Sequence, residues 1–109
     1  MTQWDDFLAK VESGMATAAT GALQGYANEV KNDTQAFLTA AKADLQTWTA
    51  QLAAGTIDGE DLAGYLKADA TLAQMAALTA AGIAEADLQR LRDTLINTVV
   101  SAAVATFKP

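Results

Sequence analysis

The side chains in this sequence that could do chemistry are mostly carboxylates. There are thirteen acidic residues against seven basic ones, with two tyrosines, no histidine and no cysteine. The absence of histidine and cysteine excludes imidazole and thiolate metal ligands, cysteine nucleophiles and the usual general base at neutral pH. It also excludes the His-Glu-x-x-His and Glu-x-x-His motifs, and the sequence has no phosphate-binding loop or nucleophile elbow. We therefore expect no enzymatic activity, no metal and no cofactor.

The densest group of carboxylates is formed by Asp58, Glu60 and Asp61. A calcium-binding loop needs alternating oxygen ligands and a terminal glutamate, which this stretch lacks. Acidic residues in the first turn of a helix interact favourably with the helix dipole, and Asp58 is a suitable N-cap residue. We interpret the cluster as the start of a helix rather than as a cation site.

The charge balance excludes several classes of partner. The net charge is −6 and the sequence pI is about 4.3. Nucleic acids and anionic membrane surfaces attract patches of lysine and arginine, which this composition does not supply. No segment has the 18 or so consecutive apolar residues of a transmembrane helix, and the acidic N-terminus is unlike a secretory signal. We expect cytoplasmic residence, which leaves export without a signal and virion assembly open.

An 11-residue repeat organises the first half of the chain. Steps of eleven from two starting points reach only apolar residues, which are Trp4, Met15, Tyr26, Phe37 and Trp48 in one series and Leu8, Ala19, Val30, Ala41 and Leu52 in the other. Steps of eleven from Ser13 reach glutamines instead. Eleven residues in three turns are about 3.67 residues per turn, close to the α-helical period. Both apolar series therefore share one face of a helix.

This repeat predicts a long amphipathic helix over residues 3–54, about 75 Å long at about 1.5 Å per residue. Gly55 suits the left-handed C′ position, with Ile57 behind it to pack on the last turn, and the same ending recurs at Gly82 and Ile83. Two shorter helices, over about 59–80 and 84–107, fold back on the long one. Asp33 could instead cap a new helix, which would break the long helix near Asn32-Asp33 and give a four-helix bundle. The fold class is all-α in either case, with a single domain over residues 1–109.

Two charge-free stretches suggest contacts between helices. Residues 13–28 contain Gly21 and Gly25, which either kink the helix or let another backbone approach closely, within the chain or between subunits. Residues 94–107 are apolar on nearly all sides of their helix, and such a helix is usually buried on nearly all sides. We expect an interface at Trp4, Leu8, Met15, Gly21, Gly25, Tyr26, Ile96, Val100, Val104 and Phe107.

The sequence thus favours a non-enzymatic structural or assembly protein, a homo-oligomer or a partner of other helical proteins, that packs through apolar helix faces. A second hypothesis is an amphipathic helix that binds a lipid or another apolar surface, although the polar face carries few lysines. A third is a small monomeric helical bundle that acts as an adaptor. We see no nucleic-acid partner.

Overall fold

The computed structural model describes residues 2–18, 23–69 and 75–107, and in this part of the chain all regular secondary structure is helical. The all-α prediction is therefore confirmed. The six helices of these residues are α1 (Gln3–Ala16), α2 (Ala27–Ala40), α3 (Lys42–Ala53), α4 (Gly59–Lys67), α5 (Ala76–Ala80) and α6 (Glu85–Phe107). None of them is both long enough and apolar enough to cross a lipid bilayer.

The predicted long N-terminal helix is wrong. Helix α1 ends at Ala16, and α2 begins only at Ala27 after a turn in which Gly25 has a φ of +98°. The longest dimension of the molecule is 41 Å, far less than the 75 Å or so of the predicted helix. A positive φ is accessible to glycine at little cost, so Gly25 lets the chain reverse and bring α2 back along α1.

The alternative break near Asn32-Asp33 is also wrong, because both residues lie inside α2. The chain bends instead at Ala41, between α2 and α3. The backbone N–H of Ala41 still donates to the Phe37 carbonyl, and that of Leu45 to the Ala41 carbonyl, both at 2.8 Å. Ala41 thus ends α2 and starts α3. The repeat keeps its phase in burial across this bend, since Phe37 before it, Ala41 at it and Leu52 after it are all buried.

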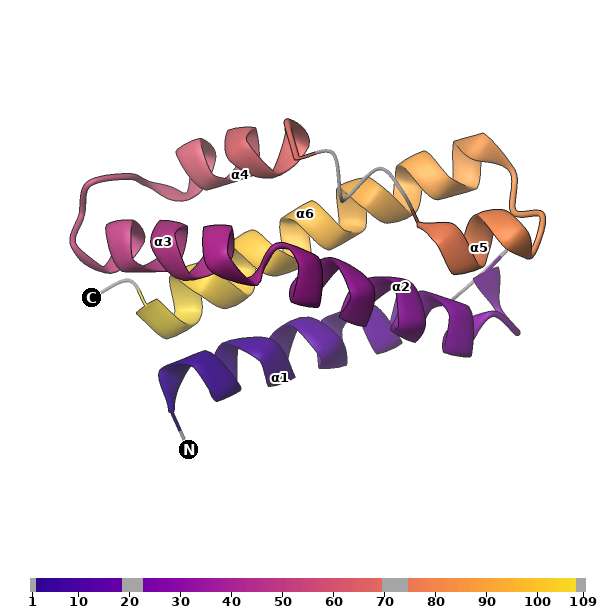
Figure 1. The fold of residues 1–109 in the computed structure, drawn as a ribbon, viewed down its shortest axis with the longest axis horizontal. Helices are drawn as coiled ribbons and strands as arrows, with labels where there is room; N and C mark the ends of the chain where they lie inside the picture. The colour runs from indigo at the N-terminus through magenta and orange to yellow at the C-terminus, as the bar shows by residue number, and fades with distance from the viewer. Residues whose placement is uncertain (1, 19–22, 70–74, 108–109) are drawn as a thin grey trace.

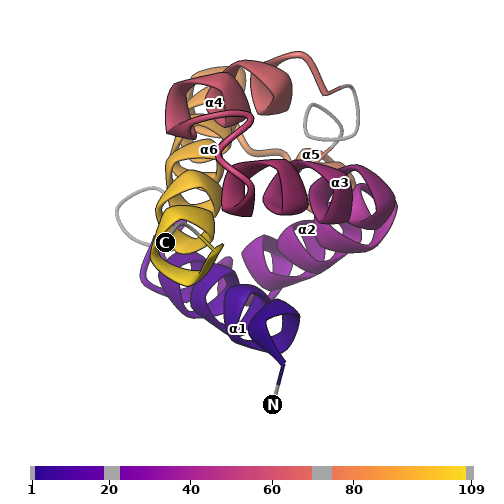
Figure 2. The same cartoon turned by 90° about the vertical axis from the view of Figure 1, so that its left-hand side faces the viewer.

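The helices form successive antiparallel passes (Figure 1). Helix α1 runs one way, α2 and α3 run back, α4 and α5 follow the direction of α1, and α6 returns. Helix α6 lies between α1 and α4, with α3 at its side (Figure 2). This enclosure explains why the C-terminal helix is apolar on nearly all sides. The apolar character of this helix had suggested a contact with a second subunit, but other helices of the same chain cover it.

The repeat correctly marks the core even though its helix is folded into pieces. Met15, Val30, Phe37 and Leu52 are all buried in a single hydrophobic cluster. The accessible area of the molecule is 5875 Å², close to the roughly 5,700 Å² expected of a folded 11.3 kDa monomer. The chain therefore closes most of its apolar surface by itself.

Helices α1 and α6 pack closely against each other. A Cβ atom added at Gly14 of α1 would lie 2.6 Å from Cγ2 of Thr98 on α6, so only glycine fits there without a shift. Near the termini, Lys10 Nζ donates to Thr106 Oγ1 at 2.9 Å, and Gln3 Nε2 donates to the Thr106 carbonyl at 3.2 Å. These contacts fix the antiparallel register of the first and last helices.

Local helix signals are confirmed at both predicted glycine endings. At Gly55, the N–H of Thr56 donates to the Gln51 carbonyl at 2.9 Å, and the N–H of Ile83 donates to the Leu78 carbonyl at 3.2 Å after Gly82. Each glycine has a positive φ, so both endings are Schellman motifs.

The predicted helix over 59–80 is wrong in its extent. Helix α4 ends at Lys67, and α5 starts after Met75, whose φ of +35° is left-handed and so interrupts any helix there. Residues 70–74 lie outside the described part of the chain. A non-glycine residue in this conformation costs about 1–2 kcal/mol, so the surrounding structure must hold it there.

The contact that holds this segment in place is made by Asp33, a buried carboxylate on α2. Its two oxygens accept the backbone N–H groups of Ala77 and Leu78, each at 2.9 Å, and the residue is only 8% exposed. These N–H groups are the ones that a local N-cap side chain would bind, and Met75 has no oxygen to offer them. Asp33 is thus a helix cap, as its residue type suggests, but for α5 rather than for a helix of its own.

Replacing Asp33 with asparagine is expected to destabilise the fold by about 2 kcal/mol. The amide removes the charge and turns a donor toward one of the two N–H groups. Chemical denaturation followed by circular dichroism measures the change. The matched control is Asp44→Asn on the exposed side of α3, which should cost less than about 1 kcal/mol. Equal losses in the two variants would contradict the capping role.

Two glycine-to-alanine substitutions should change the stability of the fold in opposite directions. Gly25→Ala places a side chain at positive φ and is expected to cost about 1–2 kcal/mol, although nothing lies within 4 Å to clash. Gly64→Ala, inside α4 with equally open surroundings, should stabilise the fold by about 1 kcal/mol. Thermal melting of both variants tests this, and stabilisation by Gly25→Ala would disprove the turn.

Candidate functional site

The acidic cluster after the third helix is explained by capping. The Asp58 side chain accepts the N–H of Asp61 at 2.9 Å, and the Asp61 carboxylate accepts the N–H of Asp58 at 3.1 Å. This reciprocal pair is a capping box at the start of α4, as the helix-start interpretation predicted. Across the described parts of the chain, no three acidic, histidine or cysteine side chains come together as metal ligands would.

The predicted interface residues of the last helix have partners in the chain itself. Ile96 is buried, and the Phe107 ring lies 5.7 Å from the ring of Phe7 on α1. Val100 and Val104 are half-buried and face Gly59 of α4, where an added Cβ would lie 3.4 and 3.5 Å from them. Their apolar character therefore serves the packing of α6 within the monomer.

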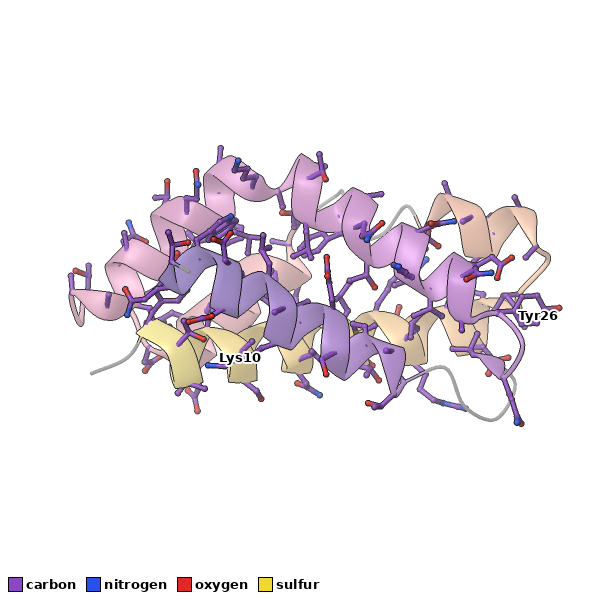
Figure 3. The ribbon with its side chains drawn as sticks, turned by 90° about the horizontal axis from the view of Figure 1, so that it is seen from below. Lys10 and Tyr26 are labelled. Carbon is purple, nitrogen blue, oxygen red and sulfur yellow. The ribbon has the colours of Figure 1, made fainter. Side chains whose placement is uncertain are left out.

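The predicted residues around the first turn fall into different environments. Met15 is buried in the core, whereas Gly25 sits at the turn, where no atom would lie within 4 Å of an added Cβ. Tyr26 is half-buried at the end of the molecule opposite the two chain termini (Figure 3). Gly21 lies outside the described residues. Among the described glycines, the tightest contact is at Gly14, which was not one of the predicted contact glycines.

Trp4 and Leu8 remain as apolar residues with one side toward solvent. Both are half-buried on α1 and face α2 across an open groove of about 440 Å³, whose floor includes the buried Leu38. Trp4 also packs on Phe7, with ring centroids 5.3 Å apart. These two predicted interface residues therefore line an open groove together.

A second groove continues along the same two helices. It has a volume of about 460 Å³ and is lined by Ala9, Glu12, Ser13, Met15 and Ala16 of α1 and by Ala27, Asn28, Lys31 and Thr34 of α2. Glu12 lines both grooves, which therefore meet at this residue. We refer to the two together as the α1–α2 groove.

The other side of α1 offers a different surface. A shallow hollow between α1 and α6 is lined by Lys10, Gly14 and a row of threonine, asparagine, serine and alanine side chains. Lys10 points toward α6 (Figure 3), where its ammonium group is already bonded to Thr106. This hollow has no large apolar side chain in its lining, whereas the α1–α2 groove is lined by Trp4, Leu8 and Leu38, so the groove is the better candidate for binding.

Sequence reasoning named Trp4 and Leu8 but missed Glu12, Lys31 and Lys42 at the edges of this groove. A signal for the two lysines was present, because they are eleven residues apart and each follows a repeat position, Val30 or Ala41. It could not be used without knowing that α1 packs beside α2.

Comparison with known proteins adds no assignment. No family model, curated protein or solved structure matches this chain.

The neighbouring residues Phe7 and Leu8 should respond differently to truncation. Phe7 is 0% exposed, so Phe7→Ala is expected to cost about 3–5 kcal/mol of unfolding free energy. Leu8 is half-buried at the groove, so Leu8→Ala should cost only about 1–2 kcal/mol. Urea denaturation at micromolar protein concentration separates the two. A loss at Leu8 as large as that at Phe7 would place Leu8 in the core.

Proposed function

We propose that this chain is a non-enzymatic structural protein whose folded unit associates with further copies of itself, or with other helical partners, through an apolar helix face. The observation that carries this proposal is the α1–α2 groove, where Trp4 and Leu8 leave one side uncovered. Tryptophan is, with tyrosine and arginine, one of the residue types that most often dominate binding energy at protein interfaces.

The composition of the chain supports a non-enzymatic role. With no histidine or cysteine, any catalytic group would have to come from the carboxylates, lysines, arginines, tyrosines or hydroxyls. Among the carboxylates, Asp33, Asp58 and Asp61 bind backbone N–H groups and cap helices. These contacts stabilise the fold and leave those groups little freedom for proton transfer.

A lipid surface is a less suitable partner than another helical protein. The apolar faces of α1, α2 and α6 point into the core, and Tyr65, at 40% exposure, is the large apolar residue most open to solvent in the described chain. A helix that binds lipid needs a broad apolar face, usually bordered by lysine or arginine. A groove between two helices suits a partner that presents a helix or a matching groove.

Self-association predicts a mass that depends on concentration. Light scattering after size-exclusion chromatography, run from about 5 µM to 1 mM, should show a weight-average mass that rises above the 11.3 kDa of the monomer. Burial of the groove residues supplies the driving force. A constant mass of one chain over this whole range would contradict self-association. Association with a different helical protein would then be the remaining form of the proposal.

A further inference from the structure

Charges of opposite sign lie on the two sides of the α1–α2 groove. Glu12 lies on the α1 side, and Lys31 and Lys42 lie on the opposite side, one in each part of the groove. All three side chains are exposed. In the described part of the chain none of the three forms an ion pair, whereas both arginines do.

The positions of these charges along the groove follow from the helices. Lys31 lies in α2 and lines one part of the groove, and Lys42 is the first residue of α3 and lines the other part. Glu12 lines both parts of the groove, and each lysine lines only one. Glu12 therefore lies between the two lysines along the length of the groove.

We propose that a second copy of this chain covers the groove, face to face, about a twofold axis that runs along it. This inference rests on the proposed self-association and specifies its surface and orientation. A twofold interface uses the same patch on both subunits, so the patch must be complementary to itself. The α1–α2 groove meets this condition because it carries one charge sign on each side.

The orientation follows from comparing the two possible axes. An axis along the groove lays α1 of each subunit on α2 of the other, which brings each Glu12 between Lys31 and Lys42 of the opposite subunit. An axis across the groove lays α1 on α1 and α2 on α2, which brings glutamate to glutamate and lysine to lysine. Like charges in contact cost free energy and opposite charges at an interface rim set orientation, so the axis along the groove is favoured.

The apolar and charged residues then have separate tasks. Trp4 and Leu8 supply the surface whose burial drives association. The exposed charges at the rim contribute less affinity but select the partner and its orientation.

The test is a charge exchange between two separately purified variants. One variant carries Glu12→Lys, and the other carries Lys31→Glu with Lys42→Glu. Each alone should dimerise at least about tenfold more weakly than the unmodified chain in sedimentation velocity at low salt, because like charges then face each other. An equimolar mixture should recover dimerisation to within about threefold, since both sets of contacts in the mixed dimer again join opposite charges.

Recovery of dimerisation on mixing distinguishes charge contacts between subunits from charge contacts within one subunit. If the charges acted only inside each monomer, mixing would change nothing, and that result would overturn the proposal. The opposite orientation also has its own signature. In that case, Glu12→Lys mixed with the unmodified chain would associate more tightly than either alone, and this result would likewise refute the axis along the groove.

Matched controls reverse charge on α4, on the opposite side of the molecule from α1 (Figure 2). Glu60 and Lys67 are both exposed. The variants Glu60→Lys and Lys67→Glu should leave dimerisation unchanged, alone or mixed. Circular dichroism verifies that every variant is folded. If the unmodified chain dimerises and the groove variants dimerise equally well, the surface assigned here is wrong while self-association stands. An unmodified chain that stays monomeric at all concentrations contradicts self-association itself.

Discussion

The fold depends on one buried carboxylate, that of Asp33. Helix α5 has only five residues and starts from a left-handed Met75, so it has little stability of its own. Asp33 satisfies the two N–H groups that this start leaves open, from a position 44 residues earlier in the chain. Helix α5 then leads through the Gly82 turn directly into α6. By fixing α5 against α2, this contact positions the beginning of the helix around which the others pack.

The arrangement of the helices decides which apolar surfaces remain for a partner. Helix α6 was one of two sequence candidates for an intersubunit contact, but α1, α3 and α4 cover it. Helix α1 packs against α6 on one side and against α2 on another. The apolar surface of α1 that stays partly uncovered lies in the α1–α2 groove. By folding into antiparallel passes, the chain buries most of the apolar stripe formed by the 11-residue repeat. The part of the stripe that stays exposed is short and is bordered by charged side chains.

The sequence predicted features that depend on near neighbours and failed where distant contacts decide. The Gly55 and Asp58 helix ends are confirmed, since each involves bonds spanning at most five residues. The 11-residue period identified core residues such as Val30 and Phe37, because burial follows helical phase. It could not reveal the turn at Gly25, since phase also persists between separate helices. The role of Asp33 and the placement of Glu12 across the groove from the lysines required knowing which helices are neighbours.

The close contact between Gly14 and Thr98 has a consequence for how the chain is made. These residues are 84 positions apart, so at the usual 5–20 residues per second the ribosome needs roughly 4–17 s to synthesise the second after the first. During that time α1 has neither α6 nor, at first, α2 to cover its apolar face. A helix that emerges before both of its packing partners is a part of a nascent chain in need of protection, and the acidic first turn of α1 at Asp5 and Asp6 helps to keep it in solution.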